Sequence, residues 1–272
     1  MVIHGAVRTK RGKVRRTNED AFGFFPDLQL YMVADGLGGH AGGEIASTLT
    51  VATMRRCLQA AQVREEQELV FPAPSAEPPL QRGWKLFSAV ECANARVFEE
   101  SCRQPGLTGM GTTVTALYFD NPYDFVTIGH VGDTRAYRIR AGVLERLTED
   151  HSLGQQLVQT GKLDKCELAA FPYRRLLTQA VGIRPIVYPE VRVEALKSGD
   201  IFLICSNGVH QEVGEEEVLE AVRDAGEDLQ QVCDWLVDAA NAQGGRDDET
   251  VLALSYNKRE DELCGIKLSL PT

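Results

Sequence analysis

The chain has 272 residues, of which 43% are hydrophobic and 25% charged, and its formal net charge at pH 7 is −10. This length and composition are typical of a globular protein with a sizeable core and favour one large domain over two small ones. The negative charge disfavours a general nucleic-acid-binding protein, because phosphate backbones require a basic surface. It also makes clustered carboxylates worth locating.

The seven cysteines are scattered along the chain and form no Cys-x-x-Cys pair. This pattern predicts neither a disulfide framework nor a zinc site, and it favours a reducing compartment. No segment approaches the ~18 apolar residues of a membrane span, and the basic N-terminus lacks the apolar stretch of a secretory signal. We therefore expect a cytoplasmic protein that does not associate with membranes.

The first part of the chain predicts two strands followed by two helices. The alternating segment MVIHGAV and the apolar run 28–34, which ends at Asp35-Gly36, are typical of strands. Amphipathic spacing predicts helices over about 44–61 and 84–103. Between them, residues 62–83 are charged and then proline-rich, which predicts a loop or mobile insertion.

The next part contains short strand-like runs separated by turn residues, typical of an antiparallel meander. These runs are 112–119, 125–131, 135–140 and 143–147. Residues 151–185 are irregular apart from a short helix near 152–160. The remaining expected elements are a strand over 201–205, a helix over 229–240, a strand over 250–256 and a C-terminal tail over 257–272. Trp84 and Trp235, both in predicted helices, are expected in the core.

Strands occur in adjacent runs and helices in their own blocks, without strict β-α-β alternation. This order predicts antiparallel sheets covered by helices, and therefore the α+β fold class.

Acidic and amide side chains recur where the predicted strands end in turns. They occur in Asn18-Glu19-Asp20, Asp35-Gly36, Gly132-Asp133-Thr134, Ser206-Asn207-Gly208 and Asp247-Asp248. Hard divalent cations prefer oxygen ligands, and a pair of them can clamp a phosphoryl oxygen and activate a water for attack. Each motif alone is weak, since an isolated Asp-Gly is usually a turn. Their order and spacing along the chain carry the prediction of a carboxylate metal site.

Seven segments resemble, in order, the motifs of the metal-dependent protein phosphatase (PPM, type 2C) family, most closely its compact bacterial members. They are GKVRRTNEDA, VADGLGGHAGGEIAS, GTTVTAL, HVGDTRAYRIR, LTEDHS, LICSNG and GRDDETV, and they fall between about residues 5 and 255. The resemblance implies one phosphatase domain over 1–256. Its fold would be a four-layer α-β-β-α sandwich of two antiparallel sheets flanked by helix pairs, with a small flap subdomain over about 151–188.

The resemblance also implies an activity. Phosphoserine and phosphothreonine in proteins would be hydrolysed by a hydroxide that bridges two divalent metals, with no phosphoenzyme. The implied cofactors are two or three Mn²⁺ or Mg²⁺ ions, and the implied partners are phosphorylated proteins of a serine/threonine kinase system. We further expect a monomer that binds neither nucleic acid nor membrane.

By position, the resemblance assigns the metal ligands. Asp35 corresponds to the carboxylate that bridges both ions, and Gly36 lends its carbonyl oxygen to one of them. Asp247 corresponds to a direct ligand of the other ion. Asn207 stands where the family has another directly ligating aspartate.

The remaining acidic motifs receive supporting roles. Glu19 and Asp20 correspond to acids that hold metal-bound waters, and Asp133 to a ligand of a weaker third metal. Arg15 corresponds to the arginine that binds the substrate phosphate, for which the parallel donors of a guanidinium are suited. Asp35, Asp20 and Arg15 are thus the expected catalytic residues.

Asn207 is the main departure from the family pattern. An amide oxygen can coordinate a cation but does not neutralise its charge. The sequence leaves open an active enzyme with weak metal binding that favours Mn²⁺, a catalytically impaired phosphoprotein-binding regulatory domain, and an introduced inactivating change. A more distant alternative is a carboxylate–metal nuclease, which the acidic composition and the lack of interleaved aromatic and basic residues disfavour.

Overall fold

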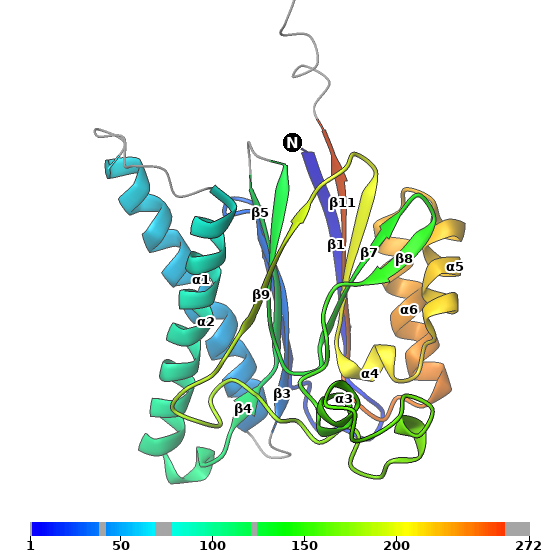
Figure 1. Cartoon of the computed structure of the whole chain (residues 1–272), viewed down its shortest axis with the longest axis horizontal. Helices are drawn as coiled ribbons and strands as arrows, with labels where there is room; N and C mark the ends of the chain where they lie inside the picture. The colour runs from blue at the N-terminus through cyan, green and yellow to red at the C-terminus, as the bar shows by residue number, and fades with distance from the viewer. Residues whose placement is uncertain (1, 38–41, 69–77, 121–123, 259–272) are drawn as a thin grey trace, which may run out of the picture.

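The computed structural model describes residues 2–37, 42–68, 78–120 and 124–258. They form four layers, two helical layers outside and two antiparallel sheets between them (Figure 1). The outer layers are the pair α1 (Gly42–Glu68) and α2 (Pro78–Arg103) and the pair α5 (Glu215–Ala225) and α6 (Leu229–Gln243). The predicted α+β class and four-layer sandwich are confirmed.

The sheet that packs against α1 and α2 has the strand order β2-β3-β5-β6-β9, and β4 pairs with the end of β3. Its strands are β2 (Asp20–Phe25), β3 (Leu30–Leu37), β4 (Gly111–Thr112), β5 (Val114–Asp120), β6 (Phe125–Val131) and β9 (Glu190–Ala195). The other sheet has the order β1-β11-β10-β7-β8. Its strands are β1 (Val2–Lys10), β7 (Arg135–Arg140), β8 (Val143–Arg146), β10 (Asp200–Cys205) and β11 (Glu249–Asn257).

Apolar side chains fill all three spaces between the layers. Along β10, Phe202 and Ile204 point into the space between the sheets, whereas Leu203 and Cys205 point toward α5 and α6. Successive side chains of a strand face opposite sides, so a strand with both faces covered reads as a continuous apolar run. Between the sheets, the Phe119 ring meets those of Tyr31 and Phe202 edge-on, with centroids 5.8 and 5.6 Å apart.

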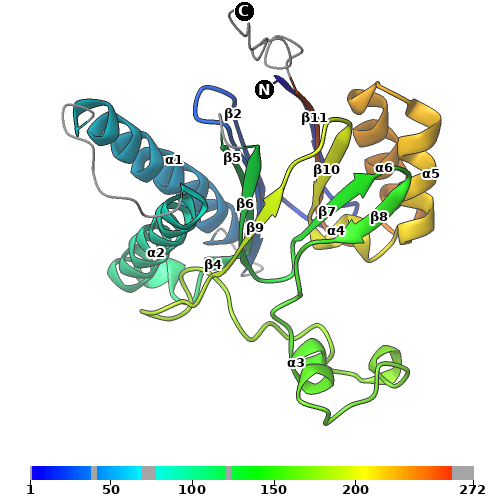
Figure 2. The same cartoon turned by 45° about the horizontal axis from the view of Figure 1, so that its top comes forward.

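The predicted flap lies between β8 and β9. It contains α3 (Leu153–Gln159) and a 3₁₀ turn (Leu168–Ala170), and Figure 2 shows it projecting from one end of the sandwich. Its backbone is tied down at both ends: the His151 N–H donates to the Gly132 carbonyl at 2.7 Å, and Val181 pairs with Thr112. The flap is therefore anchored next to the loops at that end.

The prediction of a loop over 62–83 is wrong in part. Residues 62–68 continue α1, because their Glu, Gln and Arg are good helix formers. Residues 78–83 begin α2, with Pro78 and Pro79 in its first turn, where a missing N–H costs little. Residues 69–77 and the tail beyond 258 lie outside the described residues.

The sequence prediction missed β2, β9 and α5, as well as the short helix over Asn207–His210. Asp35 and Gly36 were expected in a turn, but both lie inside β3. The two tryptophans were wrongly placed in the core: Trp84 is 68% exposed and Trp235 44% exposed. No helix within the described residues combines the length and apolarity needed to cross a membrane.

Candidate functional site

Strand pairing places two of the predicted acids opposite each other. Asp20 is the first residue of β2, and it pairs with Asp35 in the antiparallel register of β2 and β3. Directly opposed residues of a sheet have neighbouring side chains. The register therefore joins two acids that lie fifteen positions apart in the sequence.

The second sheet brings the remaining residues to the same end of the sandwich. Asn207 follows β10 and opens the short helix α4 (Asn207–His210), and Asp247 lies just before β11. Because β10 and β11 are antiparallel, with Cys205 opposite Val251, the end of one strand meets the start of the other. Asp133 lies in the turn between β6 and β7, after Gly132, which has a φ of +108°.

The side chains interact across the two sheets. Burial raises the pKa of Asp35 well above its usual value, and the charges of Asp20, Asp133 and Asp247 raise it further. The backbone N–H of Asn207 partly offsets this increase. Asp35 thus lies in an acidic cluster to which both sheets contribute carboxylates.

Two further aspartates are perturbed in the same direction. Burial raises the pKa of Asp20 to about 8, although the Thr250 and Ser206 hydroxyls oppose the shift. Burial also raises the pKa of Asp133 to about 6, with a further increase from the charge of Asp150. Clustered carboxylates with raised pKa values require either protons or cations to compensate their charge.

The cluster contains buried oxygen atoms that accept no hydrogen bond. Within the described residues, such atoms occur in every acid or amide of the predicted site except Asp247. They are Glu19 Oε2, Asp20 Oδ1, Asp35 Oδ2, Asp133 Oδ1 and Asn207 Oδ1. A buried polar atom without a partner costs about 1–3 kcal/mol, so their concentration at one place indicates a missing cationic partner.

Arg15 lies at the edge of this cluster. Its Nη2 is 2.5 Å from Asp247 Oδ1, and its Nη1 is 3.6 Å from Glu19 Oε2. Side-chain exposure is 31% for Arg15 and 26% for Asp247 but only 7% for Glu19. The guanidinium is therefore open to solvent on one side and held by acids on the other.

These acids are held in place by three threonines that the sequence did not single out, Thr112, Thr113 and Thr250, and by Asp248 of the Asp247-Asp248 motif. The Thr112 hydroxyl donates to the Asp35 carbonyl at 2.8 Å, and the Asp35 N–H donates to Thr113 Oγ1 at 3.1 Å. The Thr250 hydroxyl donates to Asp20 Oδ2 at 2.6 Å. Asp248 accepts from the N–H groups of Gly12 and Glu19, at 2.9 and 2.8 Å.

Asp248 thereby joins the loop before β2 to the start of β11. An amide in its place would offer one acceptor oxygen instead of two.

Close approach of the backbone explains some of the glycines. A Cβ at Gly36 would meet the Gly43 and Glu19 carbonyl oxygens at 2.4 and 2.6 Å. A Cβ at Gly208 would meet the Asp248 carbonyl oxygen at 2.2 Å. Because glycine has no Cβ, the segments that carry the acids can approach each other this closely. A glycine beside an acid is therefore a sequence signal for such a close approach.

In the part of the chain that the structure describes, no three His, Cys, Asp or Glu side chains already form a complete metal-ligand group. Like charges repel when no cation lies between them, and Asp247 pairs with Arg15 instead. The donor set nevertheless fits Mg²⁺ or Mn²⁺, because it consists of carboxylate and amide oxygens and five of those atoms accept no hydrogen bond.

The family profile described as Protein phosphatase 2C matches residues 9–243. The serine/threonine phosphatase stp of Listeria innocua is 31% identical over 258 residues, which cover 94% of this chain and 96% of that protein. The chain belongs to the protein phosphatase 2C family. Its order of motifs and its four-layer sandwich are therefore those of a protein phosphatase 2C, as the resemblance predicted.

Solved structures agree with this membership of the protein phosphatase 2C family. The Mycobacterium tuberculosis serine/threonine phosphatase PstP/Ppp superposes with a TM-score of 0.80 at 31% identity, covering 95% of this chain and 100% of that one. The catalytic domain of PstP in complex with two manganese ions superposes with a TM-score of 0.76 at 29% identity, covering 94% and 99%.

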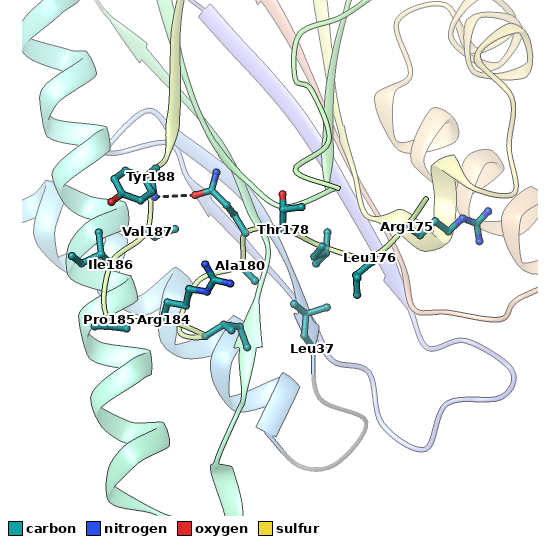
Figure 3. Close-up of a pocket in the computed structure, with 13 residues that line it drawn as sticks. Leu37, Arg175, Leu176, Thr178, Ala180, Arg184, Pro185, Ile186, Val187 and Tyr188 are labelled. Carbon is teal, nitrogen blue, oxygen red and sulfur yellow. Dashed lines mark hydrogen bonds between the residues drawn. The ribbon is translucent and has the colours of Figure 1, made fainter. Parts of the chain in front are cut away.

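Two pockets border the flap beside the acidic cluster. One, of about 690 Å³, is mostly apolar and lies between Leu37 at the end of β3 and the flap residues 175–180 and 183–188 (Figure 3). The other, of about 570 Å³, is polar, and Asp133 and His210 line it together with Arg174 and Arg175 of the flap. The His210 side chain lies 2.8 Å from the Asp133 carbonyl oxygen, so this second pocket reaches the acidic cluster.

Proposed function

We infer that the protein is a metal-dependent serine/threonine protein phosphatase. The observation that carries this inference is the set of buried oxygens that accept no hydrogen bond where the two sheets meet, in a chain of the protein phosphatase 2C family. Relatives that match almost the whole chain are named serine/threonine phosphatases. One of them, PstP, binds two manganese ions.

We propose that Asp35, Gly36, Asn207 and Asp247 hold the two cations, with Asp35 shared between them. The shared role is supported by the position of Asp35, because the charges of acids from both sheets raise the pKa of its carboxyl group. Two bound divalent cations supply positive charge that polarises phosphoryl oxygens and lowers the pKa of a water.

The remaining acids would support that pair. Glu19 and Asp20 face it from the start of β2 and would accept hydrogen bonds from water. Asp133 would hold a third, weaker cation, since it reaches the cluster only through the β6–β7 turn.

Arg15 would bind the phosphate of the substrate. Its guanidinium is 31% exposed and contacts Asp247 and Glu19 on its inner side, which fixes its orientation while leaving donors for phosphate oxygens. Asp35, Asp20 and Arg15 together would orient the phosphoryl group and the attacking water, which is the positioning that phosphoryl hydrolysis requires.

The proposed substrates are phosphoproteins made by a serine/threonine kinase, in the cytoplasm. The cysteines that the structure describes are free, which fits a reducing compartment, and the net charge of −10 opposes nucleic-acid or anionic-membrane binding. We also propose a monomer, because helices of the same chain cover the outer face of each sheet (Figure 1).

The test is hydrolysis of an aryl phosphate and of a phosphothreonine peptide, titrated with Mn²⁺ and Mg²⁺, for the parent chain and for Asn207→Asp. Saturable, metal-dependent turnover by the parent is expected. Phosphopeptide binding without turnover by the parent, together with robust turnover by the variant, would select the catalytically impaired regulatory domain. Absence of turnover by both proteins would refute the phosphatase assignment.

A further inference from the structure

The flap carries basic side chains that the proposed catalytic site does not use. The polar pocket beside Asp133 is lined by five cationic side chains. Arg135 is paired with Asp150, and the other four are Arg146, Lys165, Arg174 and Arg175. Among the described residues, none of the four has a carboxylate within ion-pair distance. Within the part of the chain that the structure describes, Arg174 alone of the four makes a side-chain hydrogen bond, to the Phe171 carbonyl at 3.3 Å.

The acids of the pocket are already engaged. Asp150 forms a bidentate pair with Arg135, at 2.9 and 2.7 Å. Glu149 accepts hydrogen bonds from Gln155 and Gln159. Asp133 belongs to the acidic cluster. The pocket therefore presents unpaired positive charge in a protein whose net charge is −10.

The two adjacent arginines are held in place by the flap backbone. The Gly154 N–H donates to the Arg174 carbonyl at 3.2 Å, and the Leu153 N–H donates to the Leu176 carbonyl at 2.8 Å. A Cβ at Gly154 would meet the Arg174 Cα at 2.8 Å, so the start of α3 packs tightly on this segment. The arginines are thus preorganised on an anchored segment.

Arg175 lies within reach of the acidic cluster. Burial and the charges of Arg174 and Arg246 lower its pKa, whereas Glu212 and Asp133 oppose that shift. Arg175 lines both pockets, and in Figure 3 its guanidinium points toward α4, whereas Arg184 lines the apolar pocket alone. An anion bound at Arg175 would therefore lie beside a phosphoresidue at the proposed catalytic site.

We propose that this basic pocket binds a second anionic group of the phosphoprotein substrate, an acidic side chain or a second phosphate that flanks the phosphoresidue. This inference rests on the proposed function, since it takes the ligand to be a phosphoprotein. The physical reason is that a partly enclosed group of unpaired guanidinium and ammonium donors recognises carboxylate or phosphate oxygens.

The test is the affinity of fluorescent peptides in which a phosphonate replaces the phosphothreonine phosphate, so that binding is measured without turnover. One peptide has aspartates beside the phosphonate residue, a second has another phosphonate residue there, and a third has alanines. Without a basic subsite, the acidic protein should bind the more negative peptides more weakly. We expect the reverse, with a preference of about fivefold for the acidic peptides at about 0.1 M salt.

The variants are Arg175→Ala with Lys165→Ala, two exposed side chains, and the matched control Arg184→Ala on the apolar side of the flap. The double variant should lose most of the preference, and the control should keep it. Equal or weaker binding of the acidic peptides by the parent, or an unchanged preference in the double variant, would overturn the proposal. Whichever peptide, the aspartate or the second-phosphonate one, gains more affinity over the alanine peptide identifies the preferred anion.

Failure of the phosphatase assignment would show separately, as absence of turnover of an ordinary phosphopeptide. The affinity ratios would still decide whether the basic pocket binds an anion.

Discussion

Buried polar groups at the two ends of strand β10 differ in whether the chain itself supplies their hydrogen-bond partners. At its start, Asp200 is fully buried and completely satisfied: Arg140 Nε and Nη2 donate to its two oxygens at 2.6 Å each, and the Lys197 N–H donates at 2.8 Å. Just past its other end, Asn207 has a buried oxygen without a partner, beside Asp35, which is 4% exposed and has a partnerless oxygen too.

The contrast separates a polar group that supports the fold from one that serves a ligand. A buried charge with a bidentate partner is compensated within the chain, and losing the partner costs stability. A group of buried acids with raised pKa values is compensated only by something from outside, which is typical of functional sites. The same substitution should therefore have opposite consequences at the two ends.

The largest effect is expected from Asp35→Asn. Turnover of an aryl phosphate at saturating Mn²⁺ should fall at least about a thousandfold, because the proposed shared ligand loses its charge. The melting temperature of the metal-free protein should stay the same or rise, since one of several repelling charges disappears. A fall of several degrees would mean that Asp35 supports the fold as Asp200 does.

The matched change at the other end is Asp200→Asn. It removes the charge that Arg140 binds and one of two acceptor oxygens, so urea unfolding should show a loss of about 1.5–3 kcal/mol. Turnover per folded molecule should be retained. Loss of activity at full stability would show that Asp200 serves the reaction and not the fold.

Asn207 can also be changed to the aspartate that the family pattern has at this position. Asn207→Asp adds a negative charge to the cluster, which should lower the Mn²⁺ concentration for half-maximal turnover and raise turnover by about tenfold or more. The metal-free variant should melt below the parent because the new charge is repelled. Equal turnover at saturating Mn²⁺ would remove Asn207 from the proposed ligand set.

The smallest effect concerns pH in the metal-free protein. Asp20 has a pKa of about 8 in the folded chain, against 3.8 for an ordinary aspartate, so folding retains a proton that the unfolded chain releases. Its contribution to stability is complete below about pH 4 and is lost as the pH rises through about 8. The melting temperature of the parent, relative to Asp20→Asn, should fall over that interval.

Addition of Mn²⁺ at pH 8 should oppose this trend, since a cation compensates the ionised carboxylates. A relative melting temperature that rises with pH in the metal-free protein would contradict the raised pKa of Asp20.

Local pattern determined much of the fold. The strands over 125–131 and 135–140 match β6 and β7 to the residue, because apolar runs are bounded there by turn residues. The missed strand β2 contains Gly23 and begins with Asp20, residues that are depleted in strands. The missed helix α5 did carry a signal, since Val218, Ala221 and Val222 follow helical spacing and are buried.

The sequence by itself also predicted the members of the proposed site, because its acids, its amide and Arg15 lie in ordered motifs. The tertiary structure alone decided how they meet. Register sets Asp20 opposite Asp35, and the closing of two sheets brings Asn207 and Asp247 to them. It also divides the flap into an apolar side and a basic side. Proximity between distant segments follows from strand pairing and layer packing, which no local spacing contains.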